Sequence, residues 1–394
     1  MAASSYFSRR SFMQLSAAAS AAASLGVFSE PLLAKAARPL DSTTAVHIDS
    51  NENPLGPSSA ARAAVASMAA QGGRYHDDVT ERFEELYAAQ NGLKRDYVRA
   101  YPGSSSPLCY SVVAFTSSQK SYVTADPGYE AGFFTADSIG TRVVKVPLTK
   151  SYSHDVKSMI DQAPDAGLFY VCTPNNPTGT LTSHSDVEYL LENKPKGSIV
   201  LVDEAYIHFS DAQSCFDLVK ADKDIVVLRT FSKLYGMAGL RCGVAVARPD
   251  LLNKIATYGG WNAMPITAVA AASASLKETQ LVPERKRINA EIRTRTFEWL
   301  DKNGFTYVAS DANFFMLDMR RPAKQVIEAM ARLNVMIGRV WPAMPNWSRI
   351  TVGTQQEMEQ FQVAFQRTMS GNTVGWSLPG VKPTRRSLDG FMVS

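Results

Sequence analysis

Six short apolar runs, rich in β-branched residues, lie between residues 102 and 248 and constrain the fold more than any other feature of the sequence. Segments that are compatible with helices separate these runs. Strands that are apolar on both faces and alternate with helices are typical of a mainly parallel sheet that helices cover on both sides. The runs are Ser121–Thr124, Arg142–Val146, Leu168–Cys172, Ile199–Val202, Ile225–Leu228 and Gly243–Ala247.

The chain is long enough for more than one hydrophobic core. Its 394 residues exceed the roughly 250–300 residues at which single cores stop growing, so we expect an α/β protein with two domains. We assign residues 76–280 to a large domain that contains the mainly parallel sheet, and residues 281–369 to a smaller α+β domain. Residues 37–75 are expected to form an N-terminal arm and part of the small domain, and residues 370–394 a tail.

Charge and cysteine content exclude several classes of function. The 41 Lys and Arg residues nearly balance the 37 Asp and Glu residues, and no basic stripe indicates nucleic-acid binding. The four cysteines lie far apart, without a Cys-x-x-Cys pair or a histidine at metal-ligand spacing. We therefore expect neither a metal site nor a disulfide framework. Cys172 and Cys242 lie in apolar runs, where we expect them to be buried.

The first 36 residues have the order of a cleavable export signal. Ser8-Arg9-Arg10-Ser11-Phe12-Met13-Gln14 resembles the twin-arginine export motif, and an apolar stretch over Leu15–Phe28 and the small-residue site Ala34-Lys35-Ala36 follow it. The apolar stretch is shorter than the ~20 residues of a membrane span, so we expect no stable membrane span. We therefore expect the twin-arginine export machinery to carry the chain, residues 1–36 to be removed, and the mature protein to be periplasmic.

Three polar segments follow three of the apolar runs directly. Pro174-Asn175-Asn176-Pro177-Thr178-Gly179 follows the run that ends at Cys172, and Asp203-Glu204-Ala205-Tyr206 follows the run that ends at Val202. Thr230-Phe231-Ser232-Lys233 follows the next run, and Arg241 comes eight residues later. Ligands of open α/β sheets bind beyond the carboxyl ends of the strands, so we expect these segments to share one site.

This order of motifs resembles the class I and II aminotransferases, which have the fold-type I architecture and use pyridoxal 5'-phosphate (PLP). Within that family, Asn51-Glu52-Asn53-Pro54, Ala238-Gly239-Leu240-Arg241-Cys242-Gly243 and Arg349-Ile350-Thr351-Val352-Gly353 look most like histidinol-phosphate aminotransferases. The similarity runs from about Val46 to Arg367. It implies a seven-stranded type of sheet, a PLP cofactor, and transfer of an amino group between an amino acid and a 2-oxo acid.

The resemblance assigns the reacting groups. Lys233 matches the lysine that holds the cofactor as a Schiff base and then moves the Cα proton as a general base. Asp203 matches the carboxylate that keeps the pyridine nitrogen protonated, because an adjacent negative charge raises the pKa of that nitrogen. Asn176 and Tyr206 match residues that bind the phenolic oxygen of the cofactor. Tyr129 matches the aromatic residue that stacks on the ring.

A second set of residues matches the phosphate-binding part of the family site. Gly103-Ser104-Ser105 precedes a segment compatible with a helix, so its backbone N–H groups are expected to form an anion cradle at a helix start. Ser232 adds a hydroxyl group to this cradle. Arg241 adds a planar, two-pronged charge, which suits the geometry of a phosphate group.

The remaining assignments concern the substrate and the partner subunit. Arg349 matches the arginine that binds the carboxylate or phosphate of the substrate, and Arg339 is a candidate second anion contact. Asn53 is assigned to substrate binding. Tyr75 matches a tyrosine that reaches the cofactor phosphate of the neighbouring subunit, which implies a homodimer with shared active sites.

Two stretches depart from the histidinol-phosphate aminotransferases. Gly103-Ser104-Ser105-Ser106-Pro107 lacks the acidic residue that usually follows the cradle glycine in that group. Trp341-Pro342-Ala343-Met344-Pro345-Asn346-Trp347 replaces a more polar stretch near the substrate. The two tryptophans either suit an aromatic or bulky apolar substrate or simply pack the small domain. Because histidine biosynthesis is cytoplasmic, the export signal also argues against histidinol phosphate as the substrate.

Several alternatives remain open on the sequence. The same fold and cofactor support lyases, decarboxylases and racemases, because the reaction depends on which bond at Cα is broken. Strict histidinol-phosphate aminotransferase activity is another alternative, and a binding protein without turnover is a third. Taken one at a time, Asp203 could be a helix cap, Tyr129 and Tyr206 core aromatics, Asn53 a turn residue and Tyr75 a surface residue.

Overall fold

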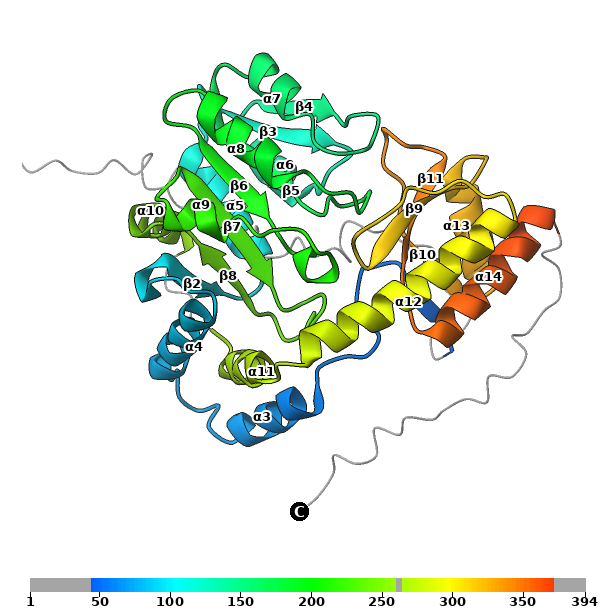
Figure 1. Cartoon of the computed structure of the whole chain (residues 1–394), viewed down its shortest axis with the longest axis horizontal. Coiled ribbons are helices and arrows are strands. Elements are labelled where there is room, and N and C mark those ends of the chain that lie inside the picture. Colours follow the sequence, from blue (N-terminus) through cyan, green and yellow to red (C-terminus); the bar gives the residue numbers. More distant parts are fainter. Residues whose placement is uncertain (1–43, 260–263, 372–394) are drawn as a thin grey trace, which may run out of the picture.

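The structure is a computed structural model that describes residues 44–259 and 264–371. Its large domain contains a seven-stranded sheet in the order β2-β8-β7-β6-β5-β3-β4 (Figure 1). β8 runs antiparallel to both of its neighbours, and the other pairs are parallel. The strands are β2 (Val98–Tyr101), β3 (Ser121–Asp126), β4 (Val143–Pro147), β5 (Ala166–Cys172), β6 (Ile199–Asp203), β7 (Ile225–Thr230) and β8 (Gly243–Val246). The mainly parallel sheet predicted from the six apolar runs is therefore confirmed, and β2 is an additional strand at one edge.

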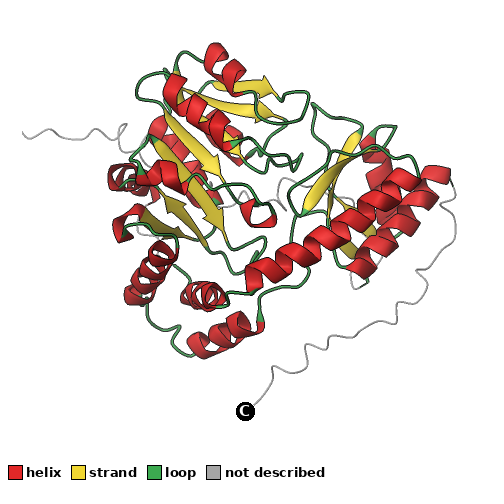
Figure 2. Cartoon of the chain, viewed as in Figure 1, coloured by secondary structure: helices red, strands yellow, loops and turns green. Residues whose placement is uncertain are grey.

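Helices cover both faces of this sheet, as Figure 2 shows. On β5, β6 and β7, alternate side chains enter two separate hydrophobic clusters, which is why these strands are apolar on both faces. One face packs against α4 (Asp77–Gln90), α7 (Val156–Gln162), α8 (His184–Asn193), α9 (Phe216–Lys220) and α11 (Ile266–Lys277). The other face packs against α5 (Ser105–Phe115), α6 (Ala131–Ser138) and α10 (Pro249–Gly259).

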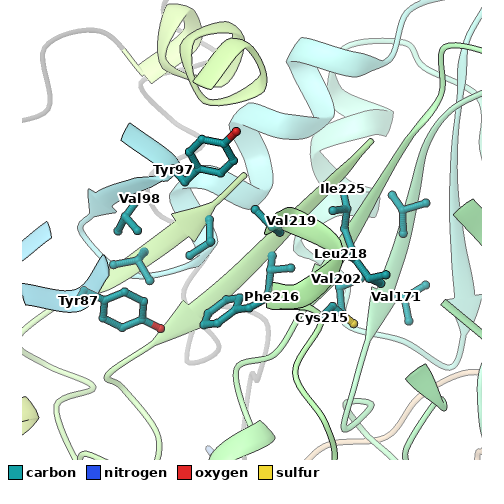
Figure 3. Packing of buried hydrophobic residues seen from close by; sticks show 14 of the residues in the cluster. Tyr87, Tyr97, Val98, Val171, Val202, Cys215, Phe216, Leu218, Val219 and Ile225 are labelled. Atoms are coloured by element: carbon teal, nitrogen blue, oxygen red, sulfur yellow. The ribbon is translucent and has the colours of Figure 1, made fainter. Parts of the chain in front are cut away.

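The face covered by α9 illustrates how densely the core is filled. Val171, Val202 and Ile225 project from three adjacent strands toward Phe216 and Val219 of α9 (Figure 3). Each of these side chains is almost completely buried. Burying such a side chain contributes about 1.5–3 kcal/mol, so the strand ends that carry the polar segments are held in fixed positions.

The small domain combines two short sheets with three helices. β9 (Phe314–Asp318) pairs antiparallel with β11 (Trp347–Thr351), and β1 (Val46–Ile48) pairs parallel with β10 (Val335–Ile337). The long helix α12 (Leu281–Lys302) connects the two domains, and α13 (Ala323–Arg332) and α14 (Gln355–Ser370) complete the small domain (Figure 1).

The N-terminal arm is divided between the domains. Its strand β1 belongs to the small domain through β10. Helix α3 (Ser59–Ala69) instead packs against α11 of the large domain. The arm between them runs past the carboxyl ends of the central strands. The predicted leader, residues 1–36, lies outside the described residues, and so does the tail after residue 371.

Several other features can be described for residues 44–259 and 264–371. All four cysteines are buried, as expected for Cys172 and Cys242. No helix in these two ranges has the length and apolar character needed to cross a bilayer. Within the same part of the chain, His, Cys, Asp and Glu side chains form no group of three or more that could hold a metal ion.

Candidate active site

The structure brings most of the predicted site residues together around one cavity of about 240 Å³ at the carboxyl ends of the central strands. Polar segments after β5, β6 and β7 line this cavity together with the start of α5 and the N-terminal arm. The lining residues are Ser50, Glu52, Ser104, Ser105, Tyr129, Cys172, Asn176, Asp203, Ala205, Tyr206, Thr230, Ser232, Lys233, Ala238, Gly239 and Arg241.

Asp203 is the last residue of β6 and is 4% exposed. Its Oδ2 accepts a hydrogen bond from the phenol of Tyr170 at 3.0 Å, and its Oδ1 accepts one from the backbone N–H of Ala205 at 3.1 Å. Burial raises the pKa of the carboxyl group to about 6, although both hydrogen bonds and the nearby charge of Lys233 lower it. Asp203 is therefore a buried acid whose ionised form a cation in the cavity would stabilise.

Lys233 follows β7 and lines the same cavity. Its Nζ lies 5.5 Å from the centre of the Tyr206 ring and donates a hydrogen bond to the backbone carbonyl of Ser50 at 3.4 Å. The arm thus contacts the lysine directly. The amine lines the cavity that Asp203 also lines, so it is placed to react with a carbonyl group bound there.

Tyr206 receives hydrogen bonds from two amide groups. Nδ2 of Asn176 lies 3.5 Å from the phenol oxygen, and Nδ2 of Asn51 lies 3.2 Å from it. Asn176 also accepts a hydrogen bond at Oδ1 from Nη1 of Arg349 at 2.8 Å. Arg349 is 1% exposed, and its Nη2 donates to the backbone carbonyl of Asp49 at 2.8 Å. The predicted anion-binding arginine and the predicted cofactor-binding residues therefore form one network.

The predicted phosphate cradle is assembled at the N-terminus of α5. Ser104 and Ser105 start this helix, and Nη1 of Arg241 donates to the hydroxyl of Ser232 at 3.1 Å. Gly103 is not a lining residue of the cavity, but it has φ +86°, and a Cβ at this position would overlap the guanidinium of Arg241. Glycine is thus needed here for the approach of Arg241 to the helix start.

Tyr129 lines the cavity as predicted, with its phenol oxygen 3.5 Å from Oγ of Ser105. The neighbouring Gly128 accepts a hydrogen bond at its carbonyl from Nε1 of Trp341 at 3.3 Å. Trp341 thereby fixes the loop that carries Tyr129. It is 1% exposed and packs with Met316, among others, in a small cluster of the small domain. Trp347 borders this cluster as well. The structure therefore supports the interpretation that the two tryptophans pack the small domain.

Arg339 forms an ion pair with Glu130, and its guanidinium stacks on Trp341 at 4.5 Å from the ring centre. Both charged side chains are mostly buried, at 13% and 21% exposure. Arg339 was predicted as a second anion contact, but its charge is balanced by a carboxylate of the protein, and it is not a lining residue of the cavity.

Two predicted site residues lie away from the cavity within this chain. Asn53 donates from Nδ2 to the backbone carbonyl of Leu234 at 2.8 Å, so it supports the loop after Lys233 and does not line the cavity. Tyr75 lies between α3 and α4 and is 63% exposed. A surface position is compatible with the predicted contact with a partner subunit, and that contact stays a prediction.

Asn51 is the residue that the sequence analysis missed. It is completely buried, contacts Tyr206, and lies two positions before the asparagine that was selected. The sequence signal was present, because both residues belong to the Asn51-Glu52-Asn53-Pro54 motif. The left-handed backbone of Asn51, with φ 53°, directs its side chain toward the large domain, and spacing alone does not reveal such a turn.

The donor set fits a phosphorylated pyridine ring. Asp203 provides a buried carboxyl group with a raised pKa, which suits a cationic ring nitrogen. Arg241, Ser232 and the start of α5 provide donors for a phosphate group in the same cavity. Lys233 lines the same cavity. A carboxyl group, an amine and an anion cradle in one cavity are what PLP requires.

Comparisons with known proteins agree with this chemistry. Residues 43–365 match the family described as aminotransferase class I and II. A histidinol-phosphate aminotransferase from Symbiobacterium thermophilum is 33% identical over 329 residues, which cover 82% of this chain and 90% of that protein. An aromatic amino acid aminotransferase from Rhodococcus erythropolis is 34% identical over 333 residues, which cover 82% of this chain and 90% of the relative. The crystal structure of histidinol-phosphate aminotransferase from Sinorhizobium meliloti in complex with pyridoxal-5'-phosphate is similar in fold, with a TM-score of 0.75 at 24% identity over 83% of this chain and 91% of that one.

Proposed function

This chain belongs to the class I and II aminotransferases, and we propose that it is an exported enzyme that acts on amino acids with an aromatic or bulky apolar side chain. It is a transaminase that uses PLP and moves an amino group between an amino acid and a 2-oxo acid. Bound PLP supplies a carbonyl group for the amine of the substrate and an electron-withdrawing ring.

The residues of the chain have distinct tasks in this reaction. Lys233 would hold the cofactor through its amine, and the same amine would move the proton at Cα of the substrate. Asp203 would favour a positive charge at the ring nitrogen, because burial raises the pKa of its carboxyl group to about 6 and a neighbouring cation stabilises the ionised form. Tyr129 covers one face of the cavity, and the cradle of Ser232, Arg241 and the α5 N-terminus binds the phosphate.

The ion pair between Arg339 and Glu130 carries the proposal on substrate class. Arg349 donates a hydrogen bond to Asn176, which lines the cavity, and its guanidinium suits the α-carboxylate of an amino acid. A substrate phosphate near Arg339 would meet the carboxylate of Glu130, and like charges repel in a poorly solvated site. This arrangement favours an amino acid without a second anionic group. The aromatic amino acid aminotransferase among the relatives supports the same class.

Export and dimer formation are further parts of the proposal. The Arg9-Arg10 motif, the apolar stretch and the small-residue site support export by the twin-arginine route to the periplasm. The exposed Tyr75 supports a homodimer in which each subunit completes the site of the other. Replacement of both arginines by lysine should retain the full-length chain in the cytoplasm. Equal amounts of mature wild-type and variant protein in the periplasm would contradict the export proposal.

A substrate panel tests the proposed substrate class. The mature protein loaded with PLP is mixed with single amino acids or histidinol phosphate, each with a 2-oxo acid acceptor, and the products are quantified. We expect kcat/KM for an aromatic or bulky apolar amino acid to exceed that for histidinol phosphate by about tenfold or more, as an unfavourable charge contact of this kind requires. A preference for histidinol phosphate would refute the substrate proposal. Release of ammonia or CO2 in place of a new amino acid would indicate a lyase or decarboxylase.

A further inference from the structure

Two hydrogen-bond relays begin on one face of β11 and end on the phenol of Tyr206. In the first relay, Nη1 of Arg349 donates to Oδ1 of Asn176 at 2.8 Å, and Nδ2 of Asn176 lies 3.5 Å from the phenol oxygen. In the second relay, the hydroxyl of Thr351 donates to Oδ1 of Asn51 at 3.2 Å, and Nδ2 of Asn51 lies 3.2 Å from the same oxygen. Arg349 and Thr351 are two positions apart on the strand, so both side chains face the large domain.

The direction of the second relay is fixed by its own hydrogen bonds. The backbone N–H of Asn51 donates to Oγ1 of Thr351 at 2.9 Å, so the proton of that hydroxyl is directed to another acceptor. The acceptor is Oδ1 of Asn51. Because the carbonyl end of the amide is held by Thr351, its NH₂ end faces Tyr206.

The backbone at Asn51 explains why this residue type is suited to the position. Its φ of 53° is left-handed, a conformation that asparagine adopts more readily than most other residues with a side chain. Nδ2 of Asn313 holds this turn by donating to the carbonyl of Asn51 at 3.2 Å. Asn51 and Thr351 are both almost completely buried, so water does not compete for their hydrogen bonds.

The two relays determine how Tyr206 can use its own proton. A phenol oxygen accepts hydrogen bonds through its lone pairs and donates one. Two amide donors approach this oxygen, one from the arm and one from the loop after β5, and occupy its lone pairs, and the phenol belongs to a residue that lines the cavity. We propose that Asn51, oriented by Thr351, is a positioning residue that makes Tyr206 a hydrogen-bond donor to the ring oxygen of the cofactor.

This inference rests on PLP as the cofactor and does not depend on the proposed substrate class or on export. A hydrogen bond donated to an anionic oxygen stabilises its deprotonated form. Loss of the relay should therefore raise the midpoint of the spectral pH titration of the bound cofactor. This titration is recorded without substrate, so its result can be separated from the outcome of the substrate panel.

The main test is Asn51→Gly, because glycine adopts a left-handed backbone without strain and introduces no charge. We expect the titration midpoint of the PLP-loaded variant to rise by about one pH unit and kcat to fall about tenfold. In a Tyr206→Phe background, the same substitution should leave the midpoint unchanged, because the residue acts through the phenol. Equal shifts in both backgrounds would overturn the proposal, and so would an unchanged midpoint in the single variant.

Thr351 provides a second, independent pair of variants. Thr351→Val keeps the shape but removes the hydroxyl that orients the amide, so the midpoint should rise, by less than in Asn51→Gly. Thr351→Ser restores the hydroxyl and should return the midpoint to the wild-type value. A serine variant that shifts as far as the valine variant, or a valine variant with the wild-type midpoint, would also overturn the proposal.

Discussion

The phenol of Tyr170 on β5 donates a hydrogen bond to Oδ2 of Asp203 on the neighbouring strand β6, at 3.0 Å. This bond stabilises the ionised carboxylate, but burial is the larger effect and raises the pKa of Asp203 to about 6. The carboxyl group is thus held in place before the cofactor binds, in a state that a cationic ring stabilises. Burial of the ionised Asp203 carboxylate is unfavourable in the cofactor-free protein, and a cationic ring bound beside it reduces this cost.

The cofactor-free protein should lose stability as the pH rises through the pKa of Asp203. Because the folded-state pKa of about 6 lies above the ordinary pKa of 3.8 for an aspartate side chain, the contribution of this group is fully present below pH 3.8 and is lost as the pH rises through 6. The loss amounts to roughly 3 kcal/mol. Asp203→Asn should remove this pH-dependent loss of stability. Urea unfolding of the cofactor-free wild type and variant, between about pH 4 and about pH 8, measures the effect. A difference between the two proteins that stays constant over this range would contradict the assignment.

Gly103→Ala should weaken cofactor binding more than it weakens the fold. Its Cβ would displace the guanidinium of Arg241, so we expect the dissociation constant of PLP to rise about tenfold or more, through the loss of a charged hydrogen bond. Gly140→Ala is the matched control, because Gly140 has a similar φ of +71° but no atom within 4 Å of its Cβ position. Both variants should lose about 1 kcal/mol of stability from backbone strain. Absorbance titration of the cofactor-free proteins measures the affinity, and equal affinity in the two variants would argue against the cradle.

Most strands of the large sheet were predictable because each forms a local run of apolar residues. β2 was not predicted, because it lacks such a run. Runs such as Ile199–Val202 are apolar at every position because helices cover both faces. β2 has only four residues and contains Arg99, whose side chain donates to the carbonyl of Leu252 on α10 at 3.1 Å. A charged residue in so short a segment hides the strand pattern.

Site residues at the ends of strands could be predicted from the sequence, whereas those within an irregular segment were harder to predict. Lys233 and Asp203 lie at strand ends, and the parallel sheet brings such ends together. Asn51 and Asn53 lie in an arm without periodicity, so only the left-handed turn decides which of them faces Tyr206. The partner of Arg339 was also not predictable, because Glu130 belongs to a loop of the other domain.

Arg229→Met should destabilise the protein strongly, although this arginine does not line the cavity. Nε of Arg229 donates to Oε2 of Glu204 at 2.7 Å, and both side chains are buried. Removal of the cation leaves a buried carboxylate without its partner, at a cost of about 3–5 kcal/mol. The double variant with Glu204→Gln should recover a large part of this loss, because no uncompensated charge remains. Urea unfolding measures both effects. A double variant that is less stable than the single variant would show that the ion pair is not the source of the effect.

Glu130→Gln should change the substrate preference toward molecules with a second anionic group. The substitution removes the carboxylate that balances Arg339, whereas the contact of the guanidinium with Trp341 at 4.5 Å keeps it in place. A buried cation without its anion attracts an anionic ligand, so kcat/KM for histidinol phosphate should rise about tenfold relative to that for an apolar amino acid. Glu291→Gln is the control, because Glu291 forms an exposed ion pair with Arg287 on α12 and should leave the ratio within about twofold of wild type. Steady-state kinetics with both substrates give the ratio. If Glu130→Gln leaves it unchanged, Glu130 does not determine substrate class.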